Sequence, residues 1–361
     1  FKDFSFNEDT RCFHDFSIYG SIKSPAQNFF IGSIQTENLN YKGVLLKYAD
    51  LLVRNRNYCT EITIKDLKTQ QGKAVGIIKI TKKPDGFNKP ESVRTSLQSE
   101  LTLKTAEKIF GGNTQKILSN FESSNTHMID FESVYFNPHY ARHKGKSFYN
   151  LLIKNSKPIL FFNRPFNKLS ARIYGRNNQH FIRSASAKFA GGQLDFNADI
   201  LETSSNDPQI NVSLTLTNCD YKQSIKHTFQ NEFTNTPIDE SIPLDLNISL
   251  KSQGSLLDLT KHNGYGNLTI KGKGLGKIHL LGPFSKALDE LNISIGTFSL
   301  NQLESYFSVE KEWINVKNLE IDGEQSHVFG QGRIWIPDQS INFNMEVDLL
   351  KNKNLSLAKL G

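Results

Sequence analysis

The sequence lacks most of the features from which an enzymatic or membrane function is usually inferred. No run of about 18 uncharged apolar residues occurs, so we predict no bilayer-spanning helix in this stretch of chain. Cysteine is scarce, and Cys12, Cys59 and Cys219 are too widely separated for a zinc site, a redox dithiol or a disulfide framework. No Gly-x-Ser-x-Gly motif marks a nucleophilic serine. The net charge of +7 comes from 43 Lys and Arg against 36 Asp and Glu, spread along the chain, which argues against a nucleic-acid-binding patch.

Phosphate-binding loops are also absent, although residues 272–276 read GKGLG. A dinucleotide fingerprint would need glycine where Lys277 stands, and a P-loop would need glycine at Lys271 and a hydroxyl at Ile278. The residues on both sides alternate between apolar and polar, so we interpret these glycines as structural, at a bend or bulge between strands.

The most frequent pattern in the sequence is the alternation of apolar and polar residues with a period of two. In INFNMEVDL (341–349) every second residue is apolar and the intervening ones are polar, as in a strand with one dry and one wet face. The same pattern occurs at 61–67, 194–200, 210–216 and 244–250. The predicted fold class is therefore mainly β, a long curved antiparallel sheet with a few short helices. A long sheet with one apolar face must curl, pack on a second layer or hold something apolar.

Helical patterns are few. Residues 99–121 read as two helical pieces interrupted at Gly111–Gly112, and 221–233 and 284–291 are further candidates. We accordingly divide the chain into a β-rich segment at 1–98, a short helical segment at 99–126 and a β-sheet region at 127–361. Because it begins at Phe1 and stops at Gly361 without a tail-like sequence, we expect it to be part of a longer protein.

Two clusters of polar residues suggest sites but have simpler interpretations. Residues 127–149 contain three histidines, with Asp130 and Glu132, but the turn expected at Asn137–Pro138 and the absent metalloprotease spacing favour no metal site. The same stretch carries three basic residues that could contact phosphate head groups or belong to a solvated loop: Arg142, Lys144 and Lys146. On a strand Cys12 and His14 would share a face but Asp15 would lie on the opposite one, so we interpret residues 11–16 as an edge strand and not as a nucleophilic site.

Residues 266–350 have a specific order of segments. A glycine-rich strand is followed by LLGPFSKAL (280–288), INVKNLEIDG (314–323) and VFGQGRIWIPDQSINFNMEVDL (328–349). In this order the chain resembles the AsmA-like C-terminal region of bacterial envelope proteins, and the resemblance covers residues 160–350 well and 1–160 loosely. It implies a β-sheet trough of the TamB and AsmA type, whose apolar interior holds acyl chains. It also implies a periplasmic location and an inner-membrane anchor outside this sequence.

The resulting hypothesis is a non-enzymatic envelope protein, without a cofactor, that shields phospholipid acyl chains during transport between membranes or maintains the outer membrane. Phospholipids and the membrane are the expected partners, other envelope proteins are further candidates, and nucleic acid is not expected. The alternative is an envelope scaffold whose apolar faces close on each other and admit no lipid. The residues predicted to line the groove are Ile210, Val212, Leu214, Leu216, Leu244, Leu246, Ile248, Leu250, Ile341, Phe343, Met345, Val347 and Leu349.

Overall fold

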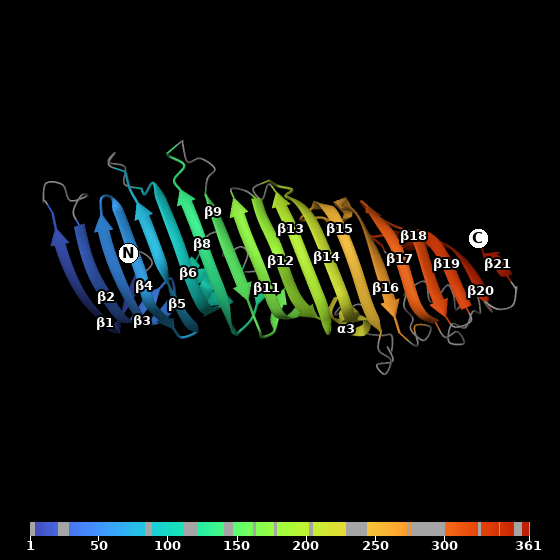
Figure 1. The fold of residues 1–361 in the computed structure, drawn as a ribbon, viewed down its shortest axis with the longest axis horizontal. Helices are drawn as coiled ribbons and strands as arrows, with labels where there is room; N and C mark the ends of the chain where they lie inside the picture. Colours follow the sequence, from blue (N-terminus) through green and yellow to red (C-terminus); the bar gives the residue numbers. More distant parts are fainter. Residues whose placement is uncertain are drawn as a thin grey trace. The chain divides into compact units, whose positions relative to one another are not determined.

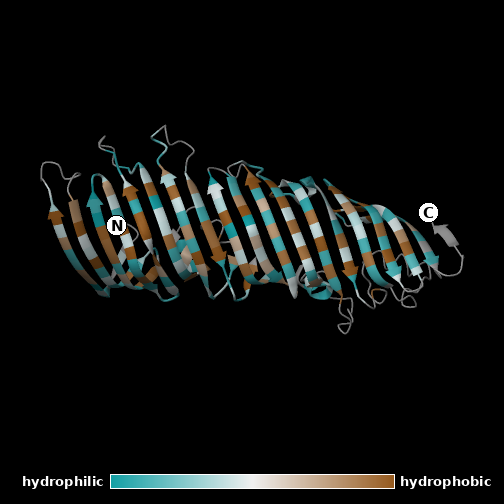
Figure 2. Ribbon diagram, viewed as in Figure 1, coloured by the Kyte–Doolittle hydropathy of each residue, from teal (hydrophilic) through white to brown (hydrophobic). Residues whose placement is uncertain are grey.

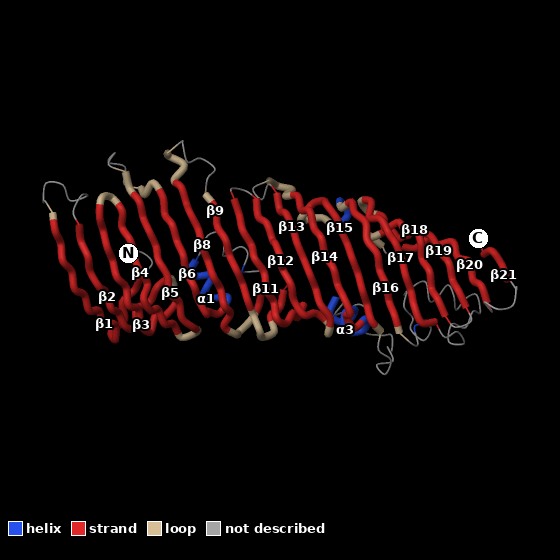
Figure 3. Tube along the Cα trace, in the orientation of Figure 1, coloured by secondary structure: helices blue, strands red, loops and turns tan. Residues whose placement is uncertain are grey.

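The computed structural model describes residues 4–20, 29–83, 89–110, 118, 121–140, 147–161, 164–176, 179–201, 205–228, 244–272, 275, 300–323, 326–338, 340–349 and 356–360. The chain divides into two compact units, unit 1 (residues 1–180) and unit 2 (residues 181–361). Both are antiparallel sheets made almost entirely of strands, with few short helices among the described residues (Figures 1 and 3). The predicted mainly β, antiparallel fold class is confirmed. The unit boundary differs from the division into three segments drawn from the sequence.

Unit 1 is a meander. Its strands are β1 (Phe4–Tyr19), β2 (Phe29–Tyr41), β3 (Val44–Arg56), β4 (Cys59–Thr69), β5 (Gly72–Thr81), β6 (Ser92–Thr102), β7 (Phe121–Glu122), β8 (Thr126–Phe136), β9 (Phe148–Lys154), β10 (Ile159–Phe161) and β11 (Arg164–Arg176). Strands β1 to β6 pair in sequence order, followed by β8, β9 and β11. The short strands β7 and β10 pair with each other, and β10 also pairs with the start of β11.

A short helix packs against a buried apolar cluster of unit 1. Strand β6 runs to Thr102, whose hydroxyl accepts a hydrogen bond from the Thr105 amide, and α1 (Leu103–Phe110) follows from this cap. Ile109 of α1 packs against the buried cluster of Leu39, Val44 and Leu46. Residues 99–102, predicted as helix, are thus the end of a strand, and the second helical piece proposed before residue 121 lies mainly outside the described residues.

Unit 2 is a second meander. It contains most of β12 (Gln179–Phe189), then β13 (Gly192–Leu201), β14 (Gln209–Asp220), β15 (Asp245–Ser255), β16 (Asn263–Lys271), β17 (Leu300–Glu310), β18 (Trp313–Gly323), β19 (Ser326–Trp335), β20 (Ser340–Leu349) and β21 (Ser356–Leu360). From β13 to β21 each strand pairs with the next one along the chain. The five alternating segments of the sequence lie in β4, β13, β14, β15 and β20, except that Leu244 precedes its strand. Figure 2 shows the alternation of hydrophobic and hydrophilic residues along the strands.

The connections of unit 2 add a helix and a 3-10 turn. Helix α3 (Tyr221–Thr228) begins where the Asp220 carboxylate accepts a hydrogen bond from the Gln223 amide, 2.7 Å away, an N-cap. This helix lies within the candidate predicted at 221–233. The turn η3 (Leu259–Lys261) joins β15 to β16. The predicted helical segment at 284–291 lies outside the described residues, as does most of the glycine-rich segment 272–276.

Candidate functional site

In unit 2, residues that are mainly apolar form rows that cross the strands. The Cα register places Leu214 opposite Leu250, Leu250 opposite Gly266, and Gly266 opposite Phe307. In an antiparallel sheet, residues that lie opposite each other project to the same face. The register therefore gives four rows on one face: Ala198–Val212–Ser252–Gly264–Val309–Ile314–Ile334–Ile341, Phe196–Leu214–Leu250–Gly266–Phe307–Val316–Gly332–Phe343, Leu194–Leu216–Ile248–Leu268–Ser305–Leu319–Gly330–Met345, and Cys219–Leu246–Ile270–Leu303–Ile321–Val328. We call this surface the apolar face.

Two β-bulges keep the apolar face continuous. In β18, Val316 lies opposite Gly332 and Leu319 lies opposite Gly330, so three chain steps in β18 match two in β19. The extra residue, Lys317, has no partner in either neighbouring strand and is exposed. In β14 the same displacement occurs between Leu216 and Cys219. Side chains three positions apart in a regular strand project to opposite faces. The extra residue of each bulge allows both flanking apolar side chains to project to the same face.

A groove of about 260 Å³ opens on the apolar face, over β16 to β20. Its walls are apolar apart from one serine: Leu268, Leu303, Ser305, Phe307, Ile314, Val316, Leu319, Ile334, Ile341 and Phe343. The volume is slightly below the 300–1,000 Å³ of typical small-molecule pockets, so the groove fits a short section of an apolar chain.

Glycines and phenylalanines lie opposite each other beside the groove. A Cβ on Gly332 would come within 2.6 Å of Phe343 Cγ, and one on Gly266 within 2.6 Å of Phe307 Cζ. The two rings thus occupy the space above these glycines. Cross-strand covering of glycine by an aromatic ring fixes the register and excludes water from the main chain at that point.

The predicted lining residues lie mainly on this face, but few of them line the groove. Ile341 and Phe343 are in its wall. The predicted residues of β14 and β15 lie on the same face, towards the N-terminal strands of unit 2, and Met345 lies opposite Gly330. Leu244 precedes β15 and is 1% exposed, with its carbonyl bound by the amide of Tyr221 at the start of α3. Val347 and Leu349 lie in β20, and their side chains are outside the described residues.

Sequence reasoning missed most of the groove wall, which β16 to β19 supply. The signal was present in residues 300–310, where Leu303, Ser305, Phe307 and Val309 alternate with polar or small residues. In β18 the bulge breaks the alternation between Val316 and Leu319, which hides their common face from a search with period two. Of the predicted residues, the basic head-group candidates Arg142, Lys144 and Lys146 lie outside the described residues.

The polar clusters singled out in the sequence are described only in part, and their described residues form no recognisable site. His127 of β8 is 1% exposed. Burial lowers the pKa of this imidazole. Within the described ranges, no group of three or more His, Cys, Asp or Glu side chains is placed to hold a metal ion. Cys12 and His14 lie in β1, an exposed strand whose sole described partner is β2.

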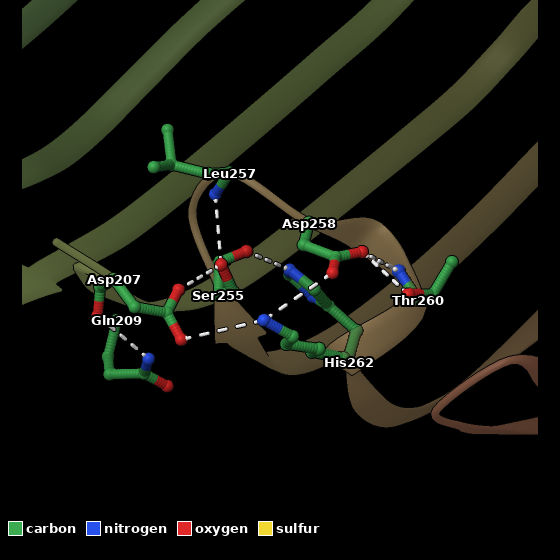
Figure 4. Close-up of polar contacts among 8 residues, drawn as sticks. Asp207, Gln209, Ser255, Leu257, Asp258, Thr260 and His262 are labelled. Carbon is green, nitrogen blue, oxygen red and sulfur yellow. Dashed lines mark hydrogen bonds and ion pairs between the residues drawn. The ribbon is translucent and has the colours of Figure 1, made fainter.

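A polar network at one end of β14, β15 and β16 includes a serine and a histidine in contact (Figure 4). His262 Nε2 donates to the Ser255 carbonyl at 2.8 Å, which leaves Nδ1 to accept from the Ser252 hydroxyl at 2.6 Å. The Asp207 carboxylate accepts from the Ser255 hydroxyl and lies 3.9 Å from Lys261 Nζ, so it does not orient the imidazole as a triad carboxylate would. The network anchors the β15–β16 connection to the loop before β14.

Comparison with known proteins adds no identification. No family model, no curated protein and no solved structure matches the chain. Among the described residues, no helix is long and apolar enough to cross a membrane.

Proposed function

We propose that the chain is a non-enzymatic protein of the bacterial envelope whose apolar face in unit 2 shields the acyl chains of phospholipids, in transport between membranes or in support of the outer membrane. The observation that carries the proposal is the groove of about 260 Å³ set in four cross-strand rows of mainly apolar residues. The AsmA-like order of segments in residues 266–350 supports the envelope location, and the membrane anchor is proposed to lie outside this sequence.

The energetics require an extended apolar surface. Exposure to water of the acyl chains of a phospholipid, with about 30 methylenes, costs roughly 24 kcal/mol of free energy, at about 0.8 kcal/mol for each methylene. The groove is too small for two whole acyl chains, so the remaining length must lie along the rows. The half-buried Leu214, Leu216, Ile248 and Leu250 extend the apolar surface over β14 and β15. A chain that moves along these rows exchanges one apolar contact for another and needs no energy-coupled residue.

The experiment compares two adjacent residues of β20 that project to opposite faces. Phe343→Glu places a carboxylate in the groove wall, whereas Asn342→Glu places one on the exposed polar face, opposite Arg333. Each full chain is expressed in a bacterial envelope and irradiated with a photoreactive phosphatidylethanolamine. We expect lipid crosslinking to be lost in Phe343→Glu and retained in Asn342→Glu, with unchanged circular dichroism. Equal crosslinking of both folded variants would reject the groove as the lipid site.

The second candidate is a structural scaffold of the envelope without a lipid ligand. In unit 1, Ile109 of α1 packs on the buried cluster of Leu39, Val44 and Leu46, and apolar surface covered by the chain itself is what a scaffold requires. A scaffold predicts that the folded protein from the envelope carries no phospholipid.

A further inference from the structure

The opposite, polar face of unit 2 carries a larger hollow, of about 630 Å³. Its position follows from the register of β13 to β17. Two cross-strand rows of polar side chains flank it: Asn197–Ser213–Lys251–Tyr265, and Asp199–Asn211–Gln253–Asn263–Glu310. The residues between the rows project to the apolar face and contribute main chain to the floor: Ala198, Val212, Ser252, Gly264 and Val309. We call this hollow the polar furrow.

The dimensions of the polar furrow select a narrow, linear ligand. Five strands at about 4.8 Å make it about 19 Å long, and rows two residues apart along a strand make it about 7 Å wide. An α-helix, about 10 Å across with its side chains, is too wide. The floor consists of main chain already paired within the sheet, so an added β-strand finds no free backbone partner there.

The chemistry of the walls favours hydroxyl groups over ions. The four charged side chains carry two charges of each sign, and the Arg183 guanidinium already pairs with Asp199. The side chains of Asn211, Ser213, Gln253 and Asn263 form no hydrogen bond with any residue that the structure describes, and together they offer both donors and acceptors. A ligand with neighbouring hydroxyls can accept from an amide NH₂ and donate to an amide oxygen along the same row.

An aromatic ring stands at the rim of the furrow. Tyr265 is 62% exposed, and its neighbours on the same face across the strands are Lys251 and Ser308. The face of an aromatic ring is negative, and it attracts the weakly positive C–H groups on one side of a pyranose ring. Exposed aromatic surface beside amide side chains suits a ligand that has both hydroxyl and C–H faces.

We propose that the polar furrow binds a neutral oligosaccharide of several linked sugars. This site lies on the face opposite the proposed acyl-chain surface and does not depend on it. The amides and Ser213 of the two flanking rows bind the sugar hydroxyls, and Tyr265 contacts the C–H face of one ring.

The test uses the full chain and a panel of six-sugar probes: chitohexaose, cellohexaose, maltohexaose and the acidic hexa-galacturonate. Binding is measured by isothermal titration calorimetry. We expect at least one neutral probe to bind more tightly than about 1 mM. The variants are Tyr265→Ala and the double variant Asn211→Ala/Gln253→Ala. Each variant should weaken binding at least fivefold. Tyr265→Ala removes the ring that contacts the sugar, and the double variant removes two hydrogen-bonding side chains.

The matched control is Tyr306→Ala. Tyr306 lies on the polar face of β17, opposite Asn267, is 53% exposed and is outside the furrow. Its loss should leave binding within about twofold, and Tyr265→Phe should bind as the native chain does because the ring remains. The proposal is overturned if no neutral probe binds, if only the acidic probe binds, or if Tyr265→Ala and Tyr306→Ala have the same effect.

Discussion

Deletion of Lys317 tests whether the bulge in β18 keeps the apolar side chains on both sides of it on the apolar face of unit 2. Without this residue, β18 has a strict period of two, and either Ile314 and Val316 or Leu319 and Ile321 must turn to the polar face. Transfer of one aliphatic side chain from a buried to an exposed position costs about 1.5–3 kcal/mol. The deletion should therefore lower the free energy of unfolding by about 3–6 kcal/mol, a large part of the roughly 5–15 kcal/mol of a typical domain.

The assay uses tryptophans already present. The chain has two, Trp313 and Trp335, whose rings stack at 6.2 Å in the pair formed by β18 and β19. Urea unfolding followed by tryptophan fluorescence therefore reports on unit 2. Lys317→Ala is the control, because it keeps the chain length and removes only an exposed side chain, so it should change stability by less than about 0.5 kcal/mol. A deletion that costs no more than this control would refute the argument that the bulge sets the phase.

Two further predictions concern stability. Gly332→Ala should destabilise unit 2 by about 1–3 kcal/mol, because the new Cβ would clash with the Asn342 carbonyl oxygen. Unchanged urea unfolding followed by tryptophan fluorescence would contradict this. In unit 1, burial lowers the folded-state pKa of His127 below its unfolded value of about 6.5. Between these two pKa values the unfolded state binds more protons than the folded state. The free energy of unfolding therefore falls as the pH falls through this range. Urea unfolding followed by circular dichroism should show this loss below about pH 6.5, and His127→Gln should reduce it; equal slopes in the two proteins would show that His127 is not responsible.

The strands of this protein are largely predictable from its sequence, because apolar and polar residues alternate strictly along a half-buried strand. Ile341, Phe343 and Met345 alternate without interruption, and the structure places them in one strand with one apolar face. Helix α3 was also predictable, since Asp220 is a favourable cap at its start.

The groove was less predictable, because it depends on which residues lie opposite each other across strands. Local alternation does not specify register, and an unpaired residue such as Lys317 inverts the pattern that a search for alternation follows. The pairing of Gly332 with Phe343 can likewise be recognised only when the register of β19 and β20 is known. The polar furrow was missed for the same reason, since Asn211 and Gln253 are 42 positions apart in the chain and meet only through β14 and β15.

The most direct test of the central proposal is native mass spectrometry, with lipid extraction, of the chain purified from a bacterial envelope. The proposed function predicts co-purified phospholipid on the native chain and on Asn342→Glu, and its loss from Phe343→Glu. A folded native chain free of phospholipid would contradict the acyl-chain function and favour the scaffold.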